Sequence, residues 1–335
     1  AAMTRLLDVE LRRLLSRRLF RLLMLGVLAT ILILNIVLGV RSNRNFAAAE
    51  ARAAALAEQY ATPPPGMLAH CGGKVNQVPV APPAGDAGGP VAVGPCAFRP
   101  PTAAELYSDP RFSFAGNAVH ELNTAVDLVA VVGFIVGAGF IGAEWAAGTF
   151  PLLLTWRPRR LRVLAAKALA TIGVFVVAGA AAIVLAMGCA WLIATTRGTT
   201  GGTNTHVWHI LFSDGLRGLV LVALLTGAGL AIAGLTRHTS SVLAGAIGYL
   251  VVFEVVMRRF HPEWQRWFLL NNAGALLNGW VHIELPPRLL IPGQGPSLFT
   301  LHADRAALYL GALFVGAMAA WAIALVRRDV DEAGR

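Results

Sequence analysis

The sequence is poor in charged residues, and it lacks the short motifs that mark common enzyme classes. Only 14% of its 335 residues are Asp, Glu, Lys or Arg, while 56% are hydrophobic and the mean hydropathy is +0.63. This balance is typical of a chain that crosses a membrane several times. The sequence contains no GxxxxGK[ST] phosphate loop, no HExxH zinc motif and no GxSxG nucleophile elbow. We therefore expect no catalytic residues, no metal site and no cofactor bound by this chain itself.

The charge that is present is mostly positive, with 28 Lys and Arg against 18 Asp and Glu. No stretch alternates basic and aromatic residues as a nucleic-acid groove does, and many arginines flank apolar runs. Membrane lipids with anionic headgroups are therefore an expected partner, and nucleic acid is not.

Cysteine is scarce, and its three copies fall into two groups. Cys71 and Cys96 lie in a polar region rich in Pro and Gly, while Cys189 lies in an apolar run. No CxxC pair is present, which argues against a zinc site or a thioredoxin-like site. If the polar region lies outside the cytoplasm, we expect a disulfide between Cys71 and Cys96.

Long apolar runs predict six membrane-spanning helices, each able to cross a hydrocarbon core of about 30 Å. The first run is longer than the core of a signal peptide, and no small-residue cleavage site follows it, so we expect it to be retained. The predicted fold class is an all-α membrane protein. Its expected spans are 22–40, 125–143, 163–195, 216–235, 240–257 and 306–326.

The segments between the spans differ in composition. Residues 3–21 place leucines at helical spacing among arginines, which predicts an amphipathic helix lying in the membrane surface. Residues 41–124 are polar and contain the cysteine pair, and we expect an irregular loop there. Residues 258–305 combine tryptophans with Asn, Gly and Pro, a composition typical of interfacial or re-entrant segments.

The density of Lys and Arg near the span ends predicts the orientation. Both termini, the loop 144–162 and the tail 327–335 are expected in the cytoplasm, while residues 41–124 and 258–305 are expected outside. A disulfide can persist on the outer side, so the position of the cysteines agrees with this orientation.

The most specific stretch is 142–167, which reads GAEWAAGTFPLLLTWRPRRLRVLAAK between the second and third expected spans. Glu144 comes first, then Gly148 and Thr149, a Leu-rich turn, and a basic cluster. Lys167 is the only charge in the first turns of the following apolar run. The basic cluster comprises Arg157, Arg159, Arg160 and Arg162.

This order of residues resembles the loop after the second membrane helix in permease subunits of the type-2 ABC transporter (ABC-2) family. In that family a Glu, a Gly-Thr pair, a Leu-rich turn, a Pro, an Arg and a Lys recur at similar spacing. The family usually places a small residue or two between Pro and Arg, whereas here Arg159 follows Pro158 directly.

The resemblance implies a transport subunit and not an enzyme. Such permeases pair around a pore in the bacterial cytoplasmic membrane, as a homodimer or a heterodimer. Each docks on a separate ABC ATPase subunit, which binds ATP and Mg. The loop after the second span fits a cleft in that ATPase. The implied ATPase-coupling residues are Glu144, Gly148, Thr149, Arg157, Arg159, Arg160 and Arg162.

An apolar pore lining would suit export of lipophilic or amphipathic cargo, such as a drug, an antibiotic or a lipid. Two polar residues inside the expected spans are candidates for this pathway or for structural contacts. Asn35 can form an interhelical hydrogen bond in the first span. Glu254 lies near the end of the fifth span, where a carboxylate is costly unless it is paired or reaches water. Arg258 lies four residues later, at helical pairing distance.

Two other classes of protein stay open at this point. One is a membrane scaffold or sensor whose outer loop binds a ligand, and the other is a membrane-embedded enzyme that modifies lipids. The arginines of 144–162 could also serve only to set the topology. Purification together with a P-loop ATPase would separate a transporter from these alternatives.

Overall fold

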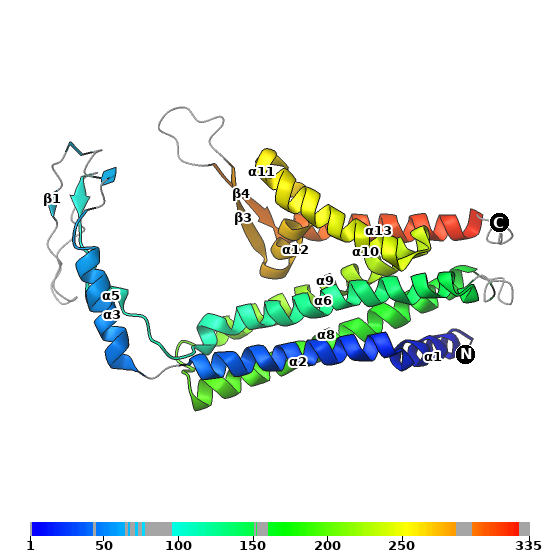
Figure 1. Ribbon diagram of the computed structural model, residues 1–335, viewed down its shortest axis with the longest axis horizontal. Helices are drawn as coiled ribbons and strands as arrows, with labels where there is room; N and C mark the ends of the chain where they lie inside the picture. Colours follow the sequence, from blue (N-terminus) through cyan, green and yellow to red (C-terminus); the bar gives the residue numbers. More distant parts are fainter. Residues whose placement is uncertain are drawn as a thin grey trace.

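The computed structural model describes residues 2–42, 45–63, 66–67, 71–72, 76–77, 96–150, 152, 160–285 and 297–327. Within these residues the protein is mostly helical, and six helices are long and apolar enough to cross a membrane. They lie along the long axis of the molecule, with α1 and the last residues of α13 at the same end (Figure 1). We call this end the α1 end. The predicted fold class, with six spanning helices, is confirmed.

Several of these helices extend beyond the expected spans. The second begins at Phe114 and not near residue 125, because the Ser113 hydroxyl accepts a hydrogen bond from the backbone N of Gly116 at 3.3 Å and caps it. The fifth contains a π-helical stretch around Glu254. The six are α2 (Arg18–Arg41), α6 (Phe114–Ala146), α8 (Arg160–Thr196), α9 (Thr205–Thr236), the joined α10 (Thr239–Tyr249), η1 (Leu250–Met257) and α11 (Arg258–Phe260), and α13 (Ala303–Arg327).

Helices α6 and α9 form the centre of the bundle, and glycines allow them to pack closely. A Cβ atom at Gly137 of α6 would collide with the backbone carbonyl of Thr226, and one at Gly229 of α9 would collide with that of Phe134. The two backbones therefore touch, which is how small residues pack membrane helices without a hydrophobic driving force. α8 completes this core, with Phe175 fully buried beside Gly133.

The N-terminal amphipathic helix is shorter than expected. α1 (Ala2–Ser16) ends at a break where Arg17 has the extended dihedrals φ −68° and ψ 131°, and residues 18–21 belong to α2. Leu14 is fully buried on α1. The break lets α1 turn away from the direction of α2 and lie against α8.

The polar segment after α2 projects from the end opposite α1 as an arm (Figure 1). It contains α3 (Phe46–Gln59), the short parallel pair β1 (Asn76–Gln77) and β2 (Ala97–Phe98), and α5 (Ala103–Leu106). Cys71 and Cys96 form a disulfide with their Cα atoms 5.7 Å apart, so the predicted pairing is confirmed. Cys189 is free. At α5, hydrogen bonds from Thr102 lower the pKa of Glu105, with Arg99 adding to the effect.

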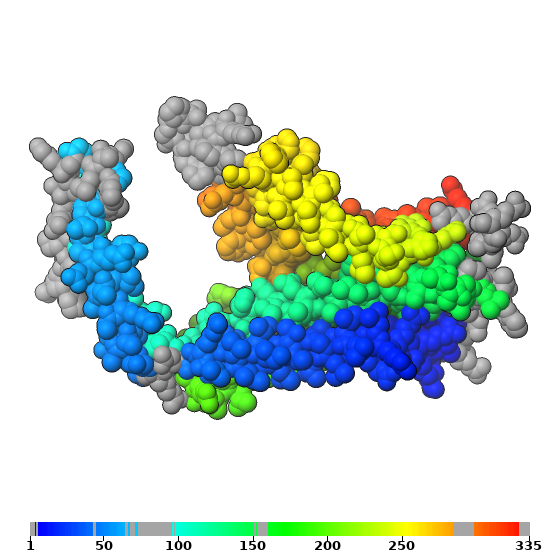
Figure 2. Space-filling view, viewed as in Figure 1, coloured from blue at the N-terminus to red at the C-terminus, as the bar shows by residue number. Residues whose placement is uncertain are grey.

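The segment after the fifth helix contains strands that the composition did not predict. It runs through a 3₁₀ turn, η2 (Pro262–Trp267), and α12 (Leu269–Asn278) into a β-hairpin. The strands β3 (Trp280–Leu285) and β4 (Ser297–His302) pair antiparallel, with Trp280 opposite His302 and Leu285 opposite Ser297. Ile283 and Leu301 are buried, so the hairpin packs one apolar face on the protein. Figure 2 shows the surface hollowed between α3 and the region of α12 and the hairpin, with α6 at the bottom of the hollow.

Candidate functional site

Four charged side chains from three regions of the chain meet inside the α1 end of the bundle. Lys167 of α8 is fully buried, and its Nζ lies 2.6 Å from Glu10 Oε2 and 2.9 Å from Glu144 Oε2. Arg17, at the α1–α2 break, places Nη2 3.2 Å from Glu144 Oε1. We call Glu10, Arg17, Glu144 and Lys167 the charge cluster. It joins α1, the last turn of α6 and the second turn of α8.

The charge cluster contains two carboxylates and two cations, and the half-exposed Arg13 adds a further cation, with Nη1 3.7 Å from Glu10 Oε1. Arg17 also donates to the carbonyl of Gly139 at 3.3 Å. The ring of Phe140 lies beneath both cations, 4.4 Å from Lys167 Nζ and 4.6 Å from the guanidinium carbon of Arg17. Removing one member of a buried ion pair leaves an uncompensated charge, which typically costs about 3–5 kcal/mol. The members therefore depend on one another.

Helical geometry explains why these residues meet. Glu10 lies one turn before Leu14 on the same face of α1, and that face is buried. Glu144 is in the final turn of α6, where the loop begins, and Lys167 is a buried cation in the second turn of α8. The cluster therefore closes the base of the loop 144–162.

The described part of that loop is shaped by Gly148 and Thr149. Gly148 adopts the left-handed φ of 67°, which favours glycine and ends α6. The Thr149 hydroxyl donates to the carbonyl of Glu144 at 3.2 Å. Leu152 is exposed. Arg157 and Arg159, two of the predicted coupling residues, lie outside the described residues.

The remaining two predicted coupling residues lie at the start of α8 and differ in their surroundings. Arg160 Nη1 donates to the carbonyl of Leu325 on α13 at 2.9 Å, so this arginine anchors one helix to another. Arg162 is exposed. On the other side of the loop, the guanidinium of Arg237, in the turn after α9, lies 4.7 Å above the ring of Trp145.

Glu254 is buried and paired, at the end of the bundle opposite the cluster. Its Oε2 lies 3.1 Å from Arg258 Nη2, and its Oε1 accepts from the backbone N of Leu270 at 2.8 Å. Leu270 is in the first turn of α12, so Glu254 caps that helix from another one. The Tyr249 hydroxyl accepts from the backbone N of Leu269 at 3.0 Å and adds to this cap.

Asn35 is buried in α2, but its side chain bonds within its own helix. Its Nδ2 donates to the carbonyl of Ile31 at 3.0 Å, in the same helix. Among the described residues Asn35 has no hydrogen bond to another helix, so the expected interhelical bond is not formed in this subunit.

Sequence reasoning missed three charged residues. The spacing of residues 3–21 predicts only a surface helix with arginines between its leucines, and it gives no role to Glu10 or Arg17, because local spacing cannot reveal partners far along the chain. Asp127 is an exposed carboxylate within the second span, and it has no ion-pair or hydrogen-bond partner among the residues that the structure describes. A lone charge in an apolar span is itself a signal of function, and it could have been found by inspection.

The structure combines six spanning helices with an amphipathic N-terminal helix. After the second span it has a loop whose base is held by the charge cluster. These features are typical of the membrane component of a transporter. The chain matches the family model described as ABC-2 family transporter protein over residues 12–283. It belongs to this family. The matched region is a membrane permease domain, a transport subunit without a catalytic domain, and ABC-2 permeases function with ATPase subunits. A comparison with curated proteins found no match.

Proposed function

We propose that this chain is the membrane-spanning subunit of an ATP-driven exporter, and that the loop 144–162 docks a separate ATPase. The observation that carries the proposal is the burial of Lys167 between Glu10 and Glu144. These contacts fix both ends of the loop to each other and to α1. A displacement of the loop is therefore transmitted to α6, α8 and α1 together.

The loop offers a partner both apolar and charged contacts. Leu152, near the middle of the loop in sequence, and Arg162, at its end, are exposed. Arg157 and Arg159 add positive charge between them in the sequence, and they are the proposed contacts with acidic groups of the ATPase. ATP and Mg would bind to that partner and not to this chain.

The exposed surface supports pairing with a second permease. The fifth helix carries a row of exposed large apolar residues, and α13 is similarly exposed. A pore between two copies, identical or different, would be bordered by such surfaces, and we propose lipophilic or amphipathic cargo on that ground. We further propose a bacterial cytoplasmic membrane with both termini inside, following the density of Lys and Arg.

The test reverses charge in the loop without touching the charge cluster. Arg157→Glu combined with Arg159→Glu is expected to weaken binding of the ATPase at least about tenfold, or to uncouple ATP hydrolysis from cargo, because charge pairs at interfaces are worth several kcal/mol. Arg160 is left in place because it also anchors α8 to α13. The measurement is affinity purification of the complex, with ATPase activity assayed with and without cargo.

The control is Arg327→Glu combined with Arg328→Glu, at and after the end of α13. This pair is expected to affect membrane insertion more than docking, since it follows a span. If the loop variant assembles fully with its ATPase, and hydrolysis still responds to cargo, the loop does not dock the partner and its arginines set topology alone.

A further inference from the structure

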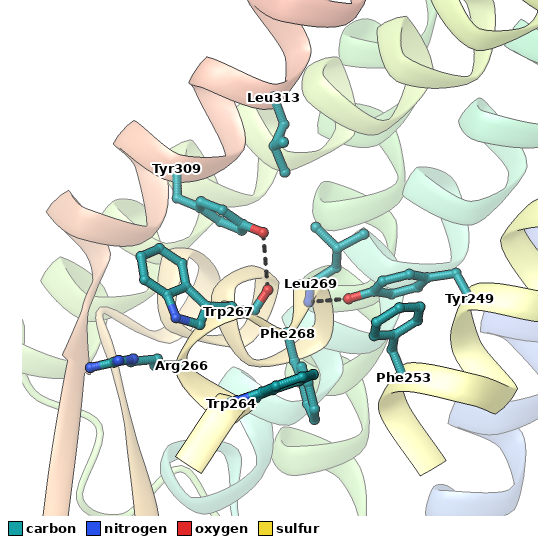
Figure 3. Close-up of a pocket in the computed structure, with 9 residues that line it drawn as sticks. All are labelled: Tyr249, Phe253, Trp264, Arg266, Trp267, Phe268, Leu269, Tyr309 and Leu313. Atoms are coloured by element: carbon teal, nitrogen blue, oxygen red, sulfur yellow. Dashed lines mark hydrogen bonds between the residues drawn. The ribbon is translucent and has the colours of Figure 1, made fainter. Parts of the chain in front are cut away.

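An aromatic pocket of about 560 Å³ lies between the fifth helix, the segment that follows it and α13 (Figure 3). It is at the end of the spans opposite the charge cluster, where the fifth helix ends and α13 begins. Its walls carry six aromatic rings, those of Tyr249, Phe253, Trp264, Trp267, Phe268 and Tyr309. This volume is in the range of pockets that hold drug-sized ligands, about 300–1,000 Å³.

The walls of the pocket are held in place by hydrogen bonds. The Tyr309 hydroxyl donates to the carbonyl of Trp267 at 3.0 Å, and the Tyr249 hydroxyl is engaged by the backbone N of Leu269 (Figure 3). The rings of Tyr249 and Phe253 stack at 5.2 Å. Because both hydroxyls are occupied by backbone groups, the pocket presents mainly the apolar faces of its rings.

One charge borders this apolar space. Arg266 is the only charged side chain among the lining residues, and its guanidinium lies 5.5 Å from the ring centre of Trp267. It has no carboxylate partner among the described residues. Trp264 and Trp267 are about half exposed. Tryptophans of this kind sit at the level of lipid headgroups, so Arg266 is placed where an anionic group would lie.

We propose that this pocket binds an anionic amphiphile, with its apolar body against the aromatic rings and its phosphate or carboxylate at Arg266. The positive charge of Arg266 at the edge of the pocket favours an anionic ligand. Arginine binds planar and tetrahedral anions through a fork of N–H donors while it stacks on an aromatic face, and Arg266 is already placed against Trp267. The site is separate from the ATPase-docking loop, so binding here does not depend on that loop's function.

The experiment uses the full chain in nanodiscs of phosphatidylcholine, and its readout is quenching of tryptophan fluorescence by brominated acyl chains. Two anionic probes distinguish the source of the ligand: brominated phosphatidylglycerol within the bilayer, and a brominated fatty acid added from water. Brominated phosphatidylcholine is the neutral reference. The pocket's share of the signal is the part lost in Trp264→Phe combined with Trp267→Phe, which keeps aromatic rings at both positions.

The pocket signal is expected to favour at least one anionic probe over the neutral reference by about fivefold, the effect of one cationic side chain at an anionic membrane surface. Arg266→Gln should remove this preference. The matched control is Arg259→Gln, an exposed arginine on α11 that does not line the pocket. Equal quenching by all three probes in the unaltered protein would overturn the proposal. So would a loss of preference in Arg259→Gln as large as in Arg266→Gln, because the charge of the whole surface would then be responsible.

Filling the pocket gives a second measurement that does not depend on charge. Leu313→Phe adds a ring at a wall residue on α13. We expect it to reduce pocket quenching by the preferred anionic probe, because the added ring takes up space between the walls. Unchanged quenching would show that the amphiphile lies on the outer surface and not between the rings.

Discussion

Lys167 and Glu10 are separated by 157 residues in the sequence, yet their charged atoms lie 2.6 Å apart in a site closed to solvent. This contact joins an amphipathic helix to the base of a spanning helix. The contact can be tested by the change in the free energy of unfolding when one partner is removed. Because the site is closed to solvent, water cannot take the place of the missing group.

Lys167→Met is expected to lower the free energy of unfolding by about 3–5 kcal/mol, since it leaves Glu10 and Glu144 buried near each other without their shared cation. Unfolding in mixed micelles, followed by circular dichroism, measures the change. Adding Glu144→Gln to this variant should recover part of the loss, and the double-mutant cycle gives the coupling. Additive effects of the two substitutions would contradict the proposed pairing. Leu169→Met, at an exposed position on the same helix, is the control.

Glu254→Ala is expected to loosen the start of α12, because it removes the acceptor of the Leu270 backbone N and the partner of Arg258. Loss of a charged cap of this kind costs about 1–3 kcal/mol. Hydrogen exchange should show faster exchange of the Leu270 amide. Glu254→Gln keeps an oxygen acceptor but removes the charge, so it separates the two contributions. If Glu254→Gln changes neither expression nor transport, both a structural and a pathway role for the charge are excluded.

The Cys71–Cys96 disulfide is expected in protein prepared without reductant, and non-reducing mass spectrometry should find the linked peptide. Closing a loop with a sequence separation of 25 residues contributes about 3 kcal/mol by loss of entropy in the unfolded chain. Reduction should therefore destabilise the arm while the spanning helices remain folded. Recovery of two free thiols from unreduced protein would contradict the pairing.

Asp127 is expected to face water or a second subunit, because an unpaired carboxylate facing lipid is costly. Asp127→Cys, in a chain with Cys189→Ala, should react with a membrane-impermeant thiol reagent added from the side of the arm. Val184→Cys is the control, since it is exposed on α8 at a similar number of residues from the same end of the bundle. Equal reactivity at the two positions would place Asp127 on the lipid-facing surface.

The sequence predicted the features that depend on local composition. Hydropathy found six spanning helices, and the separation of Cys189 from the other two cysteines identified the disulfide pair. It did not predict the break at Arg17, because the same amphipathic spacing continues through the break. The hairpin of β3 and β4 was missed because its short strands are surrounded by residues typical of loops.

The candidate site was predicted in part. The order of Glu144, Gly148 and Thr149 identified the loop, and Lys167 was noticed as an isolated charge. Its partner Glu10 could not be inferred, because the pairing depends on how α1 packs on α8. Arg160 was grouped with the coupling residues, whereas the structure gives it a contact with α13 that spacing along the loop could not indicate.

The glycine contacts between α6 and α9 restrict how this subunit can move. Two helices whose backbones touch cannot rotate or slide past each other without collisions at Gly137 and Gly229. They form a rigid pair, so any movement of helices is expected in the parts packed less tightly around them. The fifth helix is the part we expect to move most easily, because its surface is largely exposed and its link to α12 through Glu254 is polar. Any swing of that helix would carry α12 with it and change the shape of the aromatic pocket.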